Sequence, residues 1–210
     1  MKVVLYGATG KIGSRILKEL LARGHAVTAV VRDPSKLKPQ DNLKIEKGDI
    51  TDPNGIAKLG WGAEVIVSSY GPPDPAKVNE LLEVARALIA GTRRAGSPRL
   101  IVVGGAGSLE ISPGLQLVDA PTFPDAHKPT ALAHRDAFYE LRKCDLNWTY
   151  FSPSATIQPG ERTGKFRLGA NALIVDGKGN SSISSEDYAV ALVDEVEQAR
   201  HTRQRFTIGY

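Results

Sequence analysis

The chain is poor in cysteine: Cys144 is the only one among its 210 residues. A single cysteine excludes an internal disulfide and is typical of proteins that fold in a reducing compartment. The sequence also lacks a basic run interleaved with aromatics, since its 27 basic and 23 acidic residues are spread along the chain. We therefore expect no nucleic-acid partner.

Metal-ligand spacing and long apolar runs are missing as well. The four histidines, His25, His127, His134 and His201, stand far apart in the sequence, so we expect no metal site. The apolar run near the start of the chain is too short for a signal peptide or a membrane span. These absences predict a cytoplasmic protein without a membrane partner.

Short β-branched segments alternate with helical patterns along the chain. Apolar residues recur at helical spacing over 12–21, 78–89 and 188–196. The strands that we expect span residues 2–6, 26–31, 43–47, 64–68, 100–104, 148–152 and 205–208. This alternation is typical of βαβ units. It predicts an α/β fold, in which a doubly wound parallel sheet carries helices on both faces.

Two long segments interrupt the alternation. Residues 105–130 contain four prolines and little periodicity, and they predict a long loop beyond the fifth strand. Residues 157–184 are rich in glycine and predict an irregular loop with a small hairpin. Both segments follow strand ends, which form the edge at which open α/β sheets bind ligands.

Three glycines, Gly7, Gly10 and Gly13, follow the first predicted strand and precede the first predicted helix. This is the context of a dinucleotide-binding fingerprint, in which the glycines allow a tight turn, close approach of a pyrophosphate and close packing of the helix. A turn without a ligand is the alternative, and a Walker-type loop fails because no Ser or Thr follows the lysine. The amides that we expect to face the phosphates belong to Thr9, Lys11 and Ile12.

The residue that leaves the second predicted strand is Arg32, followed by Asp33, with Lys36 one turn further on. An NAD site usually places a carboxylate here to bond the ribose hydroxyls. A guanidinium can instead bind a 2′-phosphate through two N–H groups, and a carboxylate would repel that phosphate. We therefore expect NADP as the cofactor, and NAD remains the alternative if Asp33 turns inward.

The segments "GATGKIG", "VVRDP", "GDITD" and "LIVVGGAGS" together resemble the atypical short-chain dehydrogenases/reductases, in their NAD(P)H-binding, NmrA-like branch. The C-terminal half, with "PGERTGKFRLG" and "ISSEDYAVALVDE", is similar to the NADH-flavin reductase family of bacterial oxidoreductases. The resemblance covers essentially the whole chain. It implies a Rossmann-type fold, a nicotinamide cofactor and hydride transfer.

The same resemblance implies a division of the single domain and a set of cofactor contacts. Residues 1–155 would form the cofactor-binding core, 156–184 a substrate-side loop or hairpin, and 185–210 a closing helix and strand. By position, Asp49 and Ile50 would flank the adenine, and Ser68, Tyr70 and Gly71 would line the path of the ribose and nicotinamide. Gly104, Gly105 and the residues up to Ser108 would border the nicotinamide. Pro153 and Ser154 would meet its carboxamide. Ordinary loop capping is the alternative for each serine.

A Tyr-x-x-x-Lys string, the usual acid/base pair of short-chain dehydrogenases, occurs at Tyr139 and Lys143. Lys143 lies too close to the next predicted strand, at the far end of its helix, so we interpret the string as a chance match. Counting back from that strand, the position of the lysine in NmrA-like relatives falls near His134. His134 and Ser108 are the only catalytic candidates, and an exposed helix histidine is the alternative for His134.

Without a convincing proton donor, reduction of an alcohol-type carbonyl is disfavoured. A flavin or quinone-like acceptor needs little more than positioning and exclusion of water, because solvent can supply the proton. The sequence therefore predicts an NAD(P)H-dependent oxidoreductase with a small-molecule acceptor, as a monomer or homodimer. An NmrA-like redox sensor that binds NADP(H) without turnover is the alternative. Arg162, Lys165 and Arg167 could meet a flavin or cofactor phosphate, or they could form a solvated basic hairpin.

Overall fold

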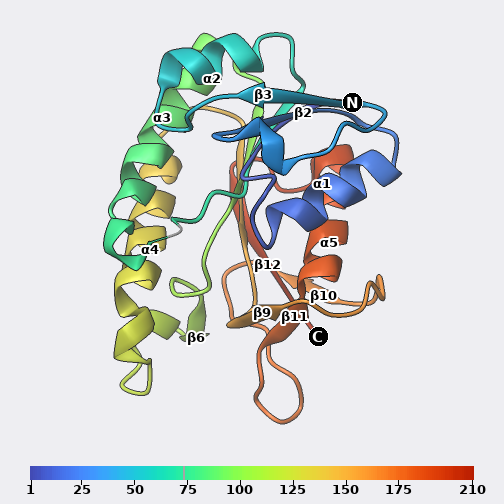
Figure 1. Ribbon diagram of the computed structural model, residues 1–210. Coiled ribbons are helices and arrows are strands. Elements are labelled where there is room, and N and C mark those ends of the chain that lie inside the picture. Colours follow the sequence, from blue (N-terminus) through green and yellow to red (C-terminus); the bar gives the residue numbers. More distant parts are fainter. Residues whose placement is uncertain (73) are drawn as a thin grey trace.

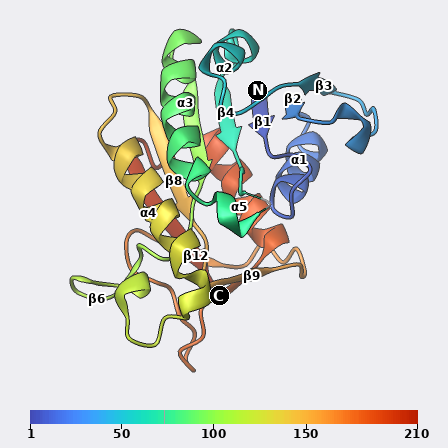
Figure 2. The ribbon, with the colours of Figure 1, turned by 60° about the vertical axis from the view of Figure 1, so that its left-hand side comes forward.

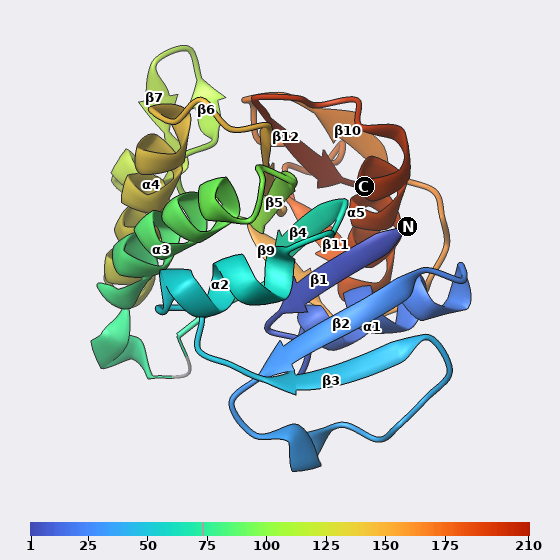
Figure 3. The same ribbon diagram turned by 90° about the horizontal axis from the view of Figure 1, so that it is seen from above.

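The computed structural model describes residues 1–72 and 74–210 and contains a central sheet of eight strands (Figure 1). In chain order these are β1 (Lys2–Tyr6), β2 (Ala26–Val31), β3 (Leu43–Lys47), β4 (Val65–Ser68), β5 (Arg99–Val103), β8 (Trp148–Ser152), β10 (Arg167–Gly169) and β12 (Gln204–Gly209). The spatial order is β10-β12-β8-β5-β4-β1-β2-β3. Figure 3 shows β4, β1, β2 and β3 side by side. The predicted strands are confirmed to within one residue at most ends.

All neighbouring strands of this sheet run parallel except β10, which pairs antiparallel with β12 at one edge. The strand order reverses at β1, because β2 and β3 lie on one side of it and β4, β5 and β8 lie on the other. In doubly wound folds such a reversal leaves a crevice at the carboxyl ends of the two central strands. Here that crevice lies at the ends of β1 and β4.

In the part of the chain that the structure describes, five α-helices cover the two faces of the sheet (Figures 1 and 2). They are α1 (Gly13–Ala22), α2 (Pro53–Gly60), α3 (Glu80–Arg94), α4 (Lys128–Arg142) and α5 (Ser185–Gln198). Helices α1 and α5 contact each other on one face, and α2, α3 and α4 pack in sequence on the other. None of the helices within residues 1–72 and 74–210 is both long and apolar enough to cross a membrane. The Rossmann-type α/β fold is therefore confirmed.

The alternation of side chains along a strand gives each face of the sheet its own core. On β1, Val3 and Leu5 pack with α1 and α5, whereas Val4 and Tyr6 pack toward α2 and α3. Strands whose residues are apolar on both faces require helices on both sides, which is the layering observed. On the α5 side the rings of Tyr188, Phe151, Phe206 and His201 stack in a column, with successive centroids 4.1, 3.9 and 4.2 Å apart.

A small hairpin was expected within residues 157–184, but the structure has its hairpin within residues 105–130. Residues 105–130 contain a hairpin of β6 (Glu110–Ser112) and β7 (Leu115–Gln116), followed by the 3₁₀ turns Leu117–Asp119 and Asp125–His127. The hairpin expected within 157–184 is wrong. There β9 (Thr156–Gln158) pairs in parallel with β11 (Ser182–Ser184), and β10 joins the main sheet instead. The partners of β9 and β10 are strands that lie far away in the sequence. A local glycine pattern does not predict such long-range strand pairing.

Candidate functional site

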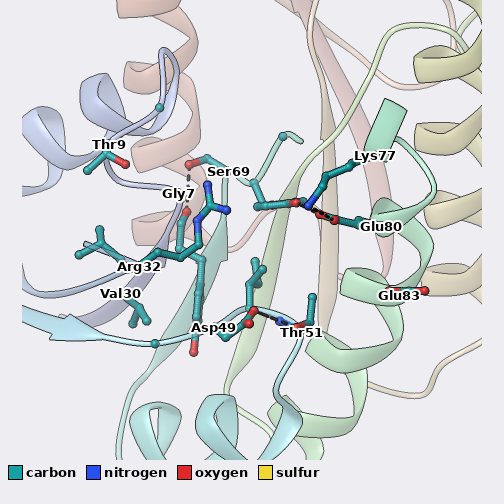
Figure 4. A pocket seen from close by; sticks show the side chains of 17 residues that line it. Gly7, Thr9, Val30, Arg32, Asp49, Thr51, Ser69, Lys77, Glu80 and Glu83 are labelled. Carbon is teal, nitrogen blue, oxygen red and sulfur yellow. Dashed lines mark hydrogen bonds and ion pairs between the residues drawn. The ribbon is translucent and has the colours of Figure 1, made fainter. Parts of the chain in front are cut away.

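A cleft of about 520 Å³ opens at the carboxyl ends of the central strands (Figure 4). Its wall combines the turn after β1 with the residues that follow β2, β3 and β4, and with the start of α3. Eight of the residues predicted from the sequence line it: Gly7, Thr9, Gly10, Arg32, Asp49, Ile50, Tyr70 and Gly71. The structure thus brings together residues that lie up to 64 positions apart in the chain.

The glycine turn at the cleft is shaped by close contacts with the loop after β4. Gly7 has φ +82°, a left-handed conformation that favours glycine. A Cβ on Gly13 would lie 2.0 Å from the Gly7 carbonyl oxygen and 2.4 Å from the Ser69 Oγ. The Ser69 hydroxyl in turn donates to the Tyr6 carbonyl oxygen at 3.0 Å. Gly7 and Gly13 are therefore demanded by the packing of the protein itself.

Gly10 differs from the other two glycines. A Cβ there would meet only the Gly7 carbonyl oxygen, at 3.2 Å, and would otherwise extend into open space. Helix α1 begins just beyond, with no acidic residue in its first turn and no side-chain cap. Among the hydrogen bonds of the described residues, none uses the N–H groups of Thr9, Lys11 or Ile12. Open amides beside a helix N-terminus and a missing Cβ fit an anionic group such as a diphosphate.

Arg32 and Asp33 face different partners at the end of β2. The Asp33 carboxylate accepts hydrogen bonds from the Ser35 N–H at 3.1 Å and the Ser35 hydroxyl at 2.7 Å, and so caps the 3₁₀ turn Pro34–Lys36. Arg32 lines the cleft and makes no ion pair or hydrogen bond within the described part of the chain. The side chain presented to the cleft at this position is therefore a cation (Figure 4).

Asp49 and Ile50 form the cleft wall after β3. The Thr51 N–H and hydroxyl donate to the Asp49 carboxylate at 2.9 and 2.8 Å, and these bonds hold the pKa of Asp49 below its usual value. The positive charge of Arg32 lowers that pKa further. Ile50 is only 8% exposed and offers an apolar surface beside the carboxylate. An ionised acceptor next to an apolar side chain can accommodate a flat, polar-edged ring.

Sequence reasoning predicted Tyr70 but missed the part of the cleft wall formed by Lys77 and by the first turn of α3, with Glu80 and Glu83. The Tyr70 hydroxyl donates to Glu80 at 2.6 Å, and Lys77 pairs with the other oxygen of the same carboxylate at 3.3 Å. Burial, together with Glu80, raises the pKa of Tyr70 to about 12. The only sequence signal for these residues is the acidic first turn of α3, with Glu80 and Glu83. Lys77 and Arg32 approach the cleft from opposite sides (Figure 4).

The remaining predicted residues lie outside the cleft wall. Lys11 and Ile12 directly precede α1, and Gly13 is its first residue. Six further residues lie at or just beyond the ends of β4, β5 and β8 without lining the cleft: Ser68, Gly104, Gly105, Ser108, Pro153 and Ser154. Ser154 donates to the Ile208 carbonyl oxygen at 2.7 Å, and Ser108 accepts from Arg205 at 2.9 Å. In this structure both serines have partners within the protein that lie 54 and 97 positions away in the chain, and these contacts are not local loop caps.

The Tyr-x-x-x-Lys string does not reach the cleft. The Tyr139 hydroxyl accepts from Gln116 at 2.8 Å, and Lys143 pairs with Glu140 at 3.2 Å. Neither residue lines the cleft. The geometry agrees with the interpretation of this string as a chance match.

Two of the three basic residues for which a phosphate contact and a solvated hairpin were the alternatives, Arg162 and Arg167, bind other parts of the protein. Arg162 binds Glu19 of α1 through two N–H groups, at 2.8 and 2.9 Å. Arg167 donates to the carbonyl oxygens of Val175 and Tyr210. These two guanidinium groups therefore hold the loop against the body of the protein.

His134 is half-buried on α4, and the expectation of an exposed helix histidine is wrong. Burial without a charged partner lowers the pKa of His134 to about 4, so the imidazole is neutral at physiological pH. No three or more His, Cys, Asp or Glu side chains gather as a metal-binding group in the part of the chain that the structure describes.

Comparison with known proteins identifies relatives along the whole chain. Residues 7–199 match the family model described as NAD(P)H-binding. YwnB of Bacillus subtilis (strain 168), a protein of uncharacterised function, is 40% identical and aligns with 99% of this chain and 98% of its own. A Burkholderia pseudomallei structure, provisionally named as an exported protein, is 53% identical with a TM-score of 0.91, and 100% of each chain is covered.

A further solved structure carries an activity in its name. A Streptococcus pneumoniae TIGR4 protein, provisionally named an NADH-flavin reductase, is 32% identical with a TM-score of 0.88, covering 100% of this chain and 99% of its own. The family model spans the glycine turn, the cleft and all five helices. By these matches, the chain belongs to the NAD(P)H-binding oxidoreductase family.

Proposed function

We propose that this protein is an NADPH-dependent oxidoreductase that passes a hydride to a flavin or quinone-like acceptor. The observation that carries the cofactor preference is the division of roles between Arg32 and Asp33. The guanidinium lines the cleft, while the carboxylate that could bond a ribose diol caps the next turn. A planar guanidinium can bind a 2′-phosphate through two parallel N–H groups. NADPH carries that phosphate and NADH does not.

The residues around the cleft divide the binding of a dinucleotide among them. Arg32 would hold the 2′-phosphate, the open amides of Thr9, Lys11 and Ile12 the diphosphate, and Asp49 with Ile50 the adenine side. Tyr70, tied to Glu80, would border the route toward the end of β5. When bound, the nicotinamide supplies the hydride.

The choice of acceptor rests on which proton donors the chain offers. A carbonyl acceptor needs an acid beside the developing alkoxide. Tyr139 and Lys143 are bonded elsewhere and outside the cleft, and Ser108 is bonded to Arg205. A flavin or quinone ring can accept the hydride while solvent provides the proton, so positioning and exclusion of water suffice. The name of the Streptococcus pneumoniae relative supports the same acceptor class.

The experiment is a turnover assay with purified protein, NADPH and a panel of acceptors: FMN, FAD, riboflavin and a simple quinone. We expect NADPH oxidation at a rate proportional to protein concentration with at least one of them. Arg32→Ala serves as the matched control, since it should raise the KM for NADPH. NADPH binding without turnover for any acceptor would reject the enzyme and favour the second candidate, a redox sensor. The position of Tyr139 and Lys143 outside the cleft is compatible with that candidate as well.

A further inference from the structure

One carboxylate connects the helix that follows the glycine turn to a distant loop. Glu186 lies in the first turn of α5. One of its oxygens accepts from the Nε of Arg15, on α1, at 3.1 Å, and the other accepts from the Gly160 N–H at 2.8 Å. Gly160 belongs to the loop of residues 159–166, which joins β9 to β10. Glu186 therefore holds α1 and this loop in a fixed relation to each other.

The Arg15–Glu186 ion pair is partly withdrawn from solvent, with side chains that are 32% and 25% exposed. Although burial opposes ionisation, the hydrogen bonds from Gly160 and Arg15 hold the pKa of Glu186 below its usual value. The carboxylate is therefore ionised at neutral pH. A cavity of about 390 Å³ beside the pair is also lined by Glu19 and Arg162, whose ion pair at 2.8 Å links α1 to the same loop a second time.

Arg15 also contacts the end of the glycine turn directly. Its Nη1 donates to the Lys11 carbonyl oxygen at 3.0 Å, and the Ser14 hydroxyl donates to the same oxygen at 3.3 Å. Within the described residues no backbone N–H donates to this oxygen, and the Arg15 N–H donates to the Ile12 carbonyl oxygen at 3.0 Å instead. The guanidinium therefore takes the place of a backbone donor at the start of the helix.

The Lys11 carbonyl and the Ile12 N–H belong to one peptide group. Because a trans peptide group is planar, its C=O and its N–H point in opposite directions. A guanidinium that holds the carbonyl on one side therefore fixes the direction of the N–H on the other side. The Ile12 N–H is one of the open amides beside the helix N-terminus, where we expect the diphosphate of the cofactor.

We propose that Arg15, held by Glu186, positions the peptide group that binds the diphosphate and couples this group to the 159–166 loop. This inference rests on the proposed binding of NADPH and adds two positioning residues to it. Neither side chain lines the cleft, so both act through the Lys11–Ile12 peptide group. Because a coupling free energy acts in both directions, occupation of the glycine turn also stabilises the loop.

Two fragments of the cofactor separate the phosphate contact at the turn from the other contacts. Adenosine 2′,5′-bisphosphate carries a phosphate for the glycine turn, whereas adenosine 2′-monophosphate carries only the phosphate expected at Arg32. In calorimetric titrations we expect Arg15→Ala to weaken binding of the bisphosphate and of NADPH about three- to tenfold, the value of one hydrogen bond. Binding of the monophosphate should stay unchanged, and a general loss of stability would not distinguish between the two fragments.

Glu186→Gln separates positioning from a simple effect of charge. Removal of a negative charge near a phosphate should strengthen binding of the bisphosphate if only electrostatics matters. If Glu186 acts by holding Arg15, the same variant should weaken that binding, as Arg15→Ala does. The matched control is Lys18→Ala, which removes a cation from the same helix that has no ion pair or hydrogen bond within the described residues. It should leave the affinities for both fragments close to wild type.

The coupling to the loop has its own measurement, because trypsin can cleave after Arg162 and Lys165. We expect NADPH to slow cleavage at these two positions in the wild-type protein and to have much less effect in Glu186→Gln. Equal rates with and without NADPH in the wild type, at saturating nucleotide, would overturn the coupling.

The titrations also distinguish failure of this inference from failure of the proposed function. Unchanged affinity for the bisphosphate in Arg15→Ala, an equal loss for both fragments, or tighter binding in Glu186→Gln would overturn the positioning role. Each of these outcomes would leave the cofactor assignment intact. If the wild-type protein binds neither NADPH nor the bisphosphate, the proposed function itself fails and the inference falls with it.

Discussion

The carboxylate of Asp187 accepts a hydrogen bond from the hydroxyl of Thr163 at 2.6 Å. The same carboxylate accepts from the Gly164 N–H and from the Tyr210 hydroxyl, both at 2.8 Å. Burial alone would raise the pKa of Asp187, but these hydrogen bonds outweigh it and leave the pKa below its usual value. One buried anion at the start of α5 therefore ties the loop around residue 163 to the last residue of the chain.

Asp187→Asn should loosen that loop. The amide keeps the shape of the side chain but loses the charge, and its NH₂ group faces donors in place of an acceptor. We expect the free energy of unfolding to fall by about 2–3 kcal/mol in urea denaturation, with faster proteolysis within residues 159–166. The matched control is Asp176→Asn, which removes a carboxylate with similar bonds to Lys178 and Asn180 in a solvent-facing loop. Equal losses for the two variants would contradict the central role of Asp187.

His134 makes stability depend on pH in the same direction as Asp187, since the pKa of each group is lower in the folded chain than in the unfolded chain. Its pKa falls from 6.5 to about 4 on folding. Below pH 6.5 the unfolded chain binds a proton that the folded chain does not, so the free energy of unfolding decreases as pH falls toward 4, by at most about 1.4 kcal/mol per unit. In His134→Asn this contribution disappears. Denaturation at several pH values should therefore show the variant gaining stability relative to wild type as pH falls, and a constant difference would contradict the shift.

Gly13 is the glycine whose replacement should cost most at the cleft. Its Cβ would lie 2.0 Å from the Gly7 carbonyl oxygen, which is backbone and cannot move aside without opening the turn. We expect Gly13→Ala to reduce the free energy of unfolding by about 3 kcal/mol or more. Gly177→Ala is the control, since nothing lies within 4 Å of its Cβ position, and it should change stability little. Thermal unfolding of both variants measures the contrast.

The sequence predicts the β1–α1–β2 unit well because every feature that builds it is local. Lys2–Tyr6 and Ala26–Val31 are apolar β-branched runs, and the glycines between them fit one type of turn. Helix α2 escaped prediction because it has only 8 residues and contains two glycines. The sequence does contain one sign of this helix: Asp52 followed by Pro53 is a typical N-cap and first-turn pair.

The residues of the cleft also differ in whether the local sequence predicts their place. Arg32 directly follows β2 and Asp49 lies two residues beyond β3, so their place at the sheet edge could be predicted from the pattern. Lys77 and Glu80 follow a connection whose path no periodicity determines. From the sequence, the Ser108 side chain could face either the cofactor or the body of the protein. Its partner in the structure, Arg205, lies 97 positions further along the chain. Contacts at such separation depend on the tertiary fold, and one sequence alone does not reveal them.

Tyr139→Phe tests whether the Tyr-x-x-x-Lys string takes part in turnover. The variant removes the hydroxyl that accepts from Gln116, and Tyr139 is 36% exposed, so the fold should tolerate the change. We expect kcat with the best acceptor to stay close to wild type. Loss of a general acid typically costs about a hundredfold or more. A fall of that size, with unchanged thermal unfolding, would place Tyr139 in the chemistry after all.

Arg32→Ala tests the preference for the phosphorylated cofactor. The guanidinium lines the cleft without an internal partner among the described residues, so its removal should cost the protein little stability. A charged hydrogen-bonding group contributes about 1.5–3 kcal/mol, so we expect the Kd of NADPH to rise roughly 10- to 150-fold. The Kd of NADH should change only slightly, because NADH offers no phosphate to this side chain. Calorimetry with both nucleotides measures the ratio, and Lys36→Ala controls for the loss of a nearby positive charge. An equal loss for NADPH and NADH would assign Arg32 to the shared part of the two cofactors and remove the argument for NADPH.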